Sequence, residues 1–490
     1  MDTPNTAPAP QAELTDREKS MTMFGILTAM FLAALDQSIV TPAMPTIGGQ
    51  LGDAQYLPWV VTAYLLAATA VAPLYGKISD IYGRRWTLYS ALGLFLLGSV
   101  IAALAPNMFV LIGGRTVQGL GGGGLFALSQ ILIGDMLPPR ERGKYAGWIA
   151  GMWAVAGAAG PLLGGTIAEI HWSLIFWLNL PLGALTIVAV NKPIKRLTIA
   201  ARAHHLDYIG AVLVVAATSA LLLMLNWGGS EYPWSSPQIL GLGAAAVVLF
   251  AGFGIRQMRA SEPLVSLEVL SSPIVLFGSF TMFMVAAANV GLAVFLPVYG
   301  QAYFDLSPAW SGYAMLGPLL FGTLGATLSG RATVWVVRVK RISIGGSLLA
   351  AAGLIAMGLT ASMHSLLVVD ILLAIVGLGM GATYPVTTVS VQNGVDQKHL
   401  GVATGMLAFL RSLGSALGVA VLGAIALGFG VPLGADAHGQ VPHFDDAMPF
   451  AVLIYVTAGI LLAATLSTQL MPHKELRSHN ASAAPVPAVE

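Results

Sequence analysis

Long apolar runs alternate with short polar segments along most of the chain. Each run holds about 20 residues with few charges, the length that a helix needs to cross a hydrocarbon core of roughly 30 Å. The runs lack the alternation of apolar and polar residues that marks the strands of membrane β-barrels. Because a chain in lipid must satisfy its own backbone polar groups, the pattern predicts an all-α polytopic membrane protein. We predict fourteen spans, at residues 21–45, 57–75, 86–105, 108–133, 145–168, 173–191, 207–226, 238–258, 273–299, 310–329, 342–361, 365–391, 401–428 and 448–470.

The composition supports this class. Of the 490 residues, 9% are charged and 56% are hydrophobic, with a mean hydropathy of +0.78, whereas soluble domains carry about 25% charged residues. The absence of cysteine excludes disulfides and thiolate metal sites. The net charge of +1 gives no indication of a nucleic-acid partner.

Lysine and arginine are distributed unevenly about the predicted spans. With the N-terminus placed in the cytoplasm, 21 of the 23 cationic residues fall on that side, and none falls in a loop on the opposite side. The other two, Arg115 and Arg411, lie within spans. Because cytoplasmic loops are enriched in these residues, the distribution predicts that both termini are cytoplasmic.

A pattern of glycines near the start of the chain is repeated near its end. A glycine-rich sequence at 117–123 recurs at 375–381, and the same offset of 258 residues relates further glycines of the following spans. Equivalent halves are typical of transporters that rock about a site between them. The predicted units are two six-helix halves at 21–191 and 273–470, two additional central helices at 207–258, and disordered cytoplasmic tails at 1–20 and 471–490.

The connection between the second and third spans concentrates charge in the sequence GKISDIYGRR. Its cations fit an orientation signal, but Asp80 does not, because acids contribute little to orientation. Gly76 and Gly83 permit a tight cytoplasmic loop and close backbone approach. A contact of Asp80 with Arg84, and with the inner end of a helix in the other half, would explain these residues as a conformational gate together with Arg85.

Two charged residues lie at similar depths inside the first half. Asp36 lies in the first span and Arg115 in the fourth, and an acid at a helix centre is costly in a membrane. Pairing would relieve both charges, and Gln118, one turn beyond Arg115, could bond either partner. Two interpretations stay open: a carboxylate that carries protons, or an acid that is paired for structure or lies near the interface.

Four motifs together resemble the major facilitator superfamily, in its fourteen-span drug:proton antiporter branch. They are LDQSIVTPAMPTI at 35–47, GKISDIYGRR at 76–85, RTVQGLGGG at 115–123 and GAAGPLLGG at 157–165. The resemblance extends from about Met21 to Met471. It implies the major facilitator fold, a central cavity that the first and fourth spans line, and proton coupling through Asp36 and Arg115.

The fifth span carries the motif that the resemblance associates with antiport, with Gly157, Gly160, Pro161, Gly164 and Gly165. Glycines four residues apart let helices approach closely, and the proline permits a bend. We expect either a bend with a tight seam between the halves or ordinary membrane packing. Further candidates for the cavity are Phe126, Met152, Trp153, Asn289, Asp370, Met406 and Arg411. For Asp370 and Arg411, pairing for structure is an equal alternative.

No enzyme signature is present, because the chain has neither an HExxH pattern nor a Walker loop. We therefore expect a transporter without a cofactor, driven by the proton gradient, that exports lipophilic or cationic small molecules from a bacterial inner membrane as a monomer. Its other partners would be protons and membrane lipids, and not nucleic acid. The alternatives are an exporter dedicated to one metabolite or lipid-like compound, and a non-transporting membrane scaffold.

Overall fold

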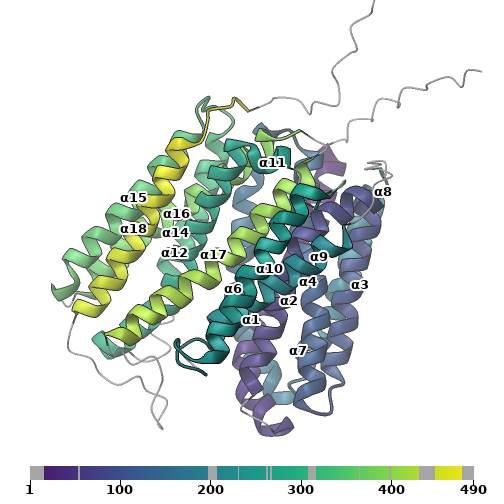
Figure 1. Ribbon diagram of the computed structural model, residues 1–490, viewed down its shortest axis with the longest axis horizontal. Helices are drawn as coiled ribbons and strands as arrows, with labels where there is room; N and C mark the ends of the chain where they lie inside the picture. Colours follow the sequence, from purple (N-terminus) through teal and green to yellow (C-terminus); the bar gives the residue numbers. More distant parts are fainter. Residues whose placement is uncertain are drawn as a thin grey trace, which may run out of the picture.

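Helices make up the computed structural model, which describes residues 16–52, 56–196, 207–229, 231–260, 263–264, 267–306, 316–363, 365–396, 399–429 and 447–476 (Figure 1). Within these residues, thirteen helices are long and apolar enough to cross a membrane. The predicted span 310–329 falls on a further helix, α14, which is described over Leu316–Ala332. The all-α fold is therefore confirmed, and each predicted span falls on one long described helix, the span 173–191 including a short helix (Leu174–Trp177) as well.

Two groups of six long helices, and one pair, account for these spans. The first group contains α1 (Asp16–Leu51), α2 (Leu57–Tyr82), α3 (Arg84–Ala103), α4 (Met108–Met136), α6 (Ala146–Ile170) and α8 (Asn179–Arg196), with the short α5 (Pro139–Arg142), η2 (Gly143–Tyr145) and α7 (Leu174–Trp177) between them. The second contains α12 (Pro273–Phe304), α14, α15 (Lys340–Leu359), α16 (Leu366–Gly394), α17 (Leu400–Gly428) and α18 (Met448–Leu470), with the short α11 (Leu267–Ser271) and η3 (Ala361–Met363). In Figure 1 the second group lies on the left and most of the first group on the right.

Each group has its own apolar core, because the buried side chains cluster within the groups. Glycines allow the close packing. A Cβ atom at Gly121 of α4 would overlap the backbone of α3 at Phe95, and one at Gly325 of α14 would overlap the backbone of α16 at Leu378. In lipid, where apolar burial drives helix association only weakly, such small-residue contacts give the van der Waals packing that holds helices together.

The pair α9 (Tyr208–Trp227) and α10 (Pro237–Arg259) pack against each other. Arg256 near the end of α10 donates to Asp207, which caps the start of α9, at 3.0 Å. Helix α9 also contacts α2 and α17, so the pair lies beside the junction of the two groups.

One end of the bundle carries the α2–α3, α4–α6, α14–α15 and α16–α17 connections, and we call it the basic end because most of the lysines and arginines lie there. Contacts tie these connections together. Asp80 at the end of α2 lies against Gly401 at the start of α17, and Gly143 of η2 lies against Gly330 of α14.

Several helices extend beyond the predicted spans. Helix α2 runs through most of the sequence predicted as a loop and ends only at Gly83, whose φ of 85° breaks the helix. Helix α1 begins at Asp16, inside the predicted first tail. Residues 471–476 of the predicted second tail pack on the bundle, where Lys340 donates to the Met471 carbonyl at 2.8 Å. The loop and tail predictions were wrong at these residues because polar side chains at helix ends can form local hydrogen bonds and ion pairs. Residues 1–15 and 477–490 of the predicted tails lie outside the described part.

Candidate functional site

A carboxylate near the middle of α1 is sealed inside the first group of helices. The Asp36 side chain is 0% exposed. Arg115 of α4 donates from Nη1 to its Oδ2 at 2.6 Å. Its Oδ1 accepts from Gln118 Nε2 at 2.7 Å and from Asn179 Nδ2 at 2.9 Å. Since these donors stand on α4 and α8, the carboxylate ties α1 to both helices.

The arginine of this pair has further partners of its own. Arg115 Nη1 donates to Gln118 Oε1 at 2.6 Å, and Nε donates to the Val60 carbonyl of α2 at 3.0 Å. The guanidinium carbon lies 4.4 Å from the centre of the Tyr64 ring and 5.8 Å from that of Phe176. A buried ion pair is tolerated when its remaining donors and acceptors are satisfied, as they are here.

The structure brings together the three residues that the sequence placed at this depth, and it adds two. Asn179 and Ser99 were missed: Ser99 Oγ of α3 accepts from Gln118 at 2.8 Å and from Asn179 at 3.2 Å. The available signal was their polarity inside or beside apolar spans. Their partners could not be inferred, because helix rotation and packing decide which polar side chains meet.

A second buried charge cluster lies at the basic end. Arg84 pairs with Asp80 through Nη1 at 2.6 Å and with Asp135 of α4 through Nε at 2.7 Å. It also donates to Ser79. The side chains of Arg84 and Asp135 are each 2% exposed, and that of Asp80 is 15% exposed. Asp135, which sequence reasoning missed, gives the arginine a second carboxylate and joins α4 to the α2–α3 connection.

The same cluster faces the second group of helices. A Cβ atom at Gly401 would lie 2.8 and 2.9 Å from the two carboxylate oxygens of Asp80, and one at Gly76 would lie 2.5 Å from the Gly401 carbonyl oxygen. Two glycines thus let α2 and α17 touch backbone to backbone. The Asp80 carboxylate, at the end of α2, lies against the first turn of α17. There the partial positive charge of the helix end favours an anion. Gly83 serves the adjacent break between α2 and α3.

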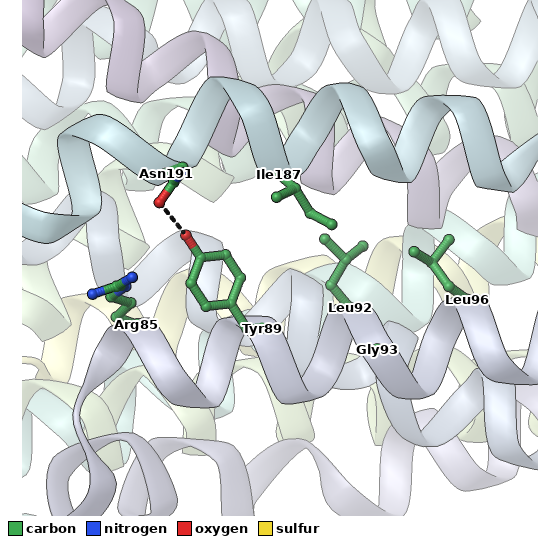
Figure 2. Close-up of a pocket in the computed structure, with 7 residues that line it drawn as sticks. All are labelled: Arg85, Tyr89, Leu92, Gly93, Leu96, Ile187 and Asn191. Atoms are coloured by element: carbon green, nitrogen blue, oxygen red, sulfur yellow. Dashed lines mark hydrogen bonds between the residues drawn. The ribbon is translucent and has the colours of Figure 1, made fainter.

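Arg85 lies apart from this cluster. Its guanidinium carbon is 5.4 Å from the centre of the Trp86 ring and 5.6 Å from that of Tyr89. Figure 2 shows it at one end of a groove between α3 and α8, where Tyr89 bonds Asn191 at 3.1 Å. Apolar residues line the rest of the groove, whose volume is about 320 Å³. Because successive residues of a helix point about 100° apart, Arg84 faces the cluster with Asp80 and Asp135 while Arg85 does not.

The glycine motif of α6 packs within the first group. Cβ atoms at Gly160 and Gly164 would overlap Ser38 and the Ile39 carbonyl oxygen of α1, while those at Gly157 and Gly165 would meet nothing within 4 Å. The expected seam between the halves is therefore not at these residues, because this face of α6 is turned toward α1. It lies at the start of α6, where Gly147 packs against Thr327 of α14. Pro161 falls within α6, and its side chain lies outside the described part.

Three of the remaining candidates meet across the junction of the two groups. The Arg411 guanidinium carbon of α17 lies 4.0 Å from the centre of the Phe126 ring on α4 and 6.0 Å from that of Trp153 on α6. The two rings are edge to face, with centroids 5.9 Å apart. All three residues are half-buried.

The other candidates lie elsewhere. Met152 is buried in the core of the first group, and Met406 is half-buried against a core of the second. Asn289 of α12 and Asp370 near the start of α16 are exposed. Met152 therefore packs between helices, and the structural pairing considered for Asp370 has no partner among the described residues.

Comparison with known proteins decides the family. The sequence profile of the Major Facilitator Superfamily matches residues 26–419. The chain belongs to the major facilitator superfamily. This is a family of transporters and not of enzymes, so the resemblance drawn from the four motifs and the expectation of a transporter are confirmed.

Members of the superfamily named as drug transporters are similar over most of the chain. Multidrug transporter protein MdtP of Bacillus subtilis is 32% identical over 409 residues, which cover 83% of this chain and 75% of that protein. Efflux pump FUS6 of Gibberella moniliformis is 33% identical over 496 residues, which cover 96% and 84%. The structure of the human organic anion transporter MFSD10 matches with a TM-score of 0.64 at 17% identity, covering 94% of this chain and all of that one, which supports the fold alone.

Proposed function

We propose that the protein exports amphipathic or lipophilic small molecules in exchange for protons, by alternating access. The observation that carries the proposal is the sealed Asp36, held by three donors inside a membrane bundle. A membrane protein bears the cost of an intramembrane carboxylate most often where an ion or proton must bind. The similarity to proteins named as multidrug transporters and efflux pumps supports export of small molecules.

Protonation of Asp36 would change the contacts of three helices. The neutral acid loses its charge, and with it the attraction for Arg115. The arginine would keep the Gln118 Oε1 and Val60 carbonyl acceptors and the face of the Tyr64 ring. Proton binding therefore loosens α1 from α4 while the arginine stays satisfied, which is a means for one proton to alter helix packing.

The contacts at the basic end support a state that is closed there. Gly76 meets Gly401, Gly143 meets Gly330, and Arg142 of α5 donates to Gln392 of α16 at 3.2 Å. By the distribution of cations, the basic end would face the cytoplasm, with both termini inside. The family resemblance favours a bacterial plasma membrane. In this state the protein would take up protons from outside and release its cargo there.

The test uses purified protein in proteoliposomes with an imposed pH gradient and a panel of fluorescent dyes. The Asp36→Asn variant should abolish gradient-driven dye transport, because it removes the acid while nearly keeping the shape of the side chain. Its amide nitrogen cannot accept a hydrogen bond, so at least one of the three bonds to Arg115, Gln118 and Asn179 is lost as well. Downhill dye exchange without a gradient should persist. Asp207→Asn is the matched control, because Asp207 is also buried and paired with an arginine but lies beside the junction, at the start of α9. Full gradient-driven transport by Asp36→Asn would remove this residue from the mechanism.

A further inference from the structure

Arg411 lacks, among the described residues, the carboxylate partners that Arg84 and Arg115 have. Arg84 and Arg115 each form ion pairs with carboxylates at 2.6–2.7 Å and are almost fully buried. Arg411 lies eleven residues into α17, about 16 Å from its start. Among the described residues, no carboxylate lies within ion-pair distance of its side chain, and its contacts are the Phe126 and Trp153 rings.

The surroundings of this arginine are apolar and aromatic on several sides. The rings of Phe126 and Trp153 come from the first group, whereas α17, which carries Arg411, belongs to the second. All three side chains are half-buried. They therefore lie at the junction of the groups and are not sealed in a core.

The contacts with the rings stabilise the cation without neutralising it. A ring face attracts a guanidinium electrostatically, but it offers no acceptor for the five N–H donors. The guanidinium carries a permanent charge, and its planar fork matches a carboxylate or sulfonate with two parallel hydrogen bonds. In this low-dielectric position an anionic ligand would be the strongest partner available to it.

We propose that Arg411 is the anchor for the anionic group of the exported molecule, and that the cargo is an amphipathic organic anion. Its apolar body, preferably aromatic, lies against Phe126 and Trp153, and its carboxylate or sulfonate binds the guanidinium. The inference rests on the proposed export function and sets the substrate class as anionic, where the sequence led us to expect lipophilic or cationic molecules. A cation would be repelled by the positive charge of Arg411 at this junction.

The partners of Arg84 and Arg115 argue against a purely structural role for Arg411. Both arginines donate to oxygen acceptors. Arg84 has two carboxylates, and Arg115 has a carboxylate, a side-chain amide oxygen and a backbone carbonyl. A structural arginine at the Arg411 position would be expected to have similar acceptors. The described residues offer it ring faces and an accessible side.

The experiment measures binding to the full-length protein in nanodiscs, with empty nanodiscs subtracted. The probes are anilinonaphthalene sulfonate, phenylnaphthylamine, which has the same rings without the sulfonate, and the cation ethidium. The wild-type protein should bind the sulfonate about 10-fold or more tightly than the neutral dye, as a charged hydrogen bond warrants. Ethidium should bind most weakly.

Substitution separates the anchor from the apolar site. Arg411→Gln should lower the affinity for the sulfonate about 10-fold or more and change that for the neutral dye less than about twofold. Arg411→Lys should retain part of the preference, because it keeps the charge but not the planar fork. Arg338→Gln, at an exposed position of the basic end, should change neither dye.

Several outcomes would overturn the inference: equal wild-type affinity for the two dyes, tighter binding of ethidium, or an equal loss of both dyes in Arg411→Gln. If that variant does not fold, the wild-type comparison and Arg411→Lys still decide. The titration needs no proton gradient. Loss of proton coupling would therefore leave this binding result unchanged. Coupled export of a neutral dye, without a preference for anions, would contradict only the role proposed for Arg411.

Discussion

Replacing Gly76 by alanine should open the basic end of the protein. The new Cβ would lie 2.5 Å from the carbonyl oxygen of Gly401 and 2.9 Å from its carbonyl carbon. Both atoms belong to the backbone of α17, so they cannot move aside as the end of a flexible side chain could. The contact joins the two groups of helices, and separating α2 from α17 relieves it without unfolding either group.

The size of the effect follows from the cost of overpacking. One methyl group forced into a closely packed contact costs about 1–3 kcal/mol. Alanine also favours the helix over glycine by roughly 0.5–1 kcal/mol, but it does so whether the seam is closed or open, so this gain cancels. The closed-to-open ratio should therefore fall about 5- to 150-fold, since each 1.4 kcal/mol is a factor of ten.

Cysteine labelling measures this ratio, because the native chain contains no cysteine. Thr333→Cys is a suitable reporter: Thr333 is 1% exposed and packs against η2, at a different contact between the groups from the mutated one. The rate of maleimide labelling in nanodiscs is proportional to the open fraction while that fraction is small. Gly76→Ala should raise this rate about 5- to 150-fold.

The control is Gly345→Ala, on α15, where a Cβ would meet nothing within 4 Å. It has the same helix propensity change and should leave the labelling rate within about twofold of the parent, because surface substitutions away from special features shift stability by less than about 0.5 kcal/mol. An unchanged rate in Gly76→Ala would refute the reasoning, since the contact would then not hold the groups together. Equal rises in both variants would show a general loosening of the fold.

Two further predictions concern the other contacts of α2 and α6. Asp80→Asn should also raise the labelling rate of the Thr333→Cys reporter, but by less than Gly76→Ala. The amide loses the ion pair with Arg84 and the favourable charge at the start of α17, but it fits the same space. A labelling rate equal to that of the parent would mean that the charges of this connection are orientation signals only. Gly164→Ala should lower the stability of the purified protein by about 1–3 kcal/mol, because its Cβ would overlap a carbonyl oxygen of α1. Gly165→Ala, where a Cβ would meet nothing within 4 Å, should not lower it, and equal thermal unfolding temperatures for the two variants would contradict the packing of α6 on α1.

The residue pattern was sufficient for the number and order of helices. Each apolar run is long enough to span, and in lipid a helix is the only way for an isolated run to satisfy its backbone, so local sequence decides the element. The helix ends were less well predicted. Helix α2 continues to Tyr82 through charged residues because Asp80 finds Arg84 nearby, a local pairing that hydropathy does not report.

For the site, the sequence by itself determined which residues are unusual. Charge inside an apolar span is costly, so Asp36, Arg115 and Arg411 are conspicuous without any structure. Their roles depend on which residues face them. The tertiary structure alone decided that the first two are paired and that the third lies on aromatic rings from the other group.

The glycines of α6 give the same lesson for packing. Their spacing shows in the sequence that two helices can approach closely, but not which helix is the neighbour. The structure turns Gly160 and Gly164 toward α1, and the part of α6 that meets the other group is Gly147, which packs against Thr327 of α14. The physical reason is that span formation is a property of one segment and its solvent, whereas the rotation of a helix about its axis is set by all the neighbours that it packs against together.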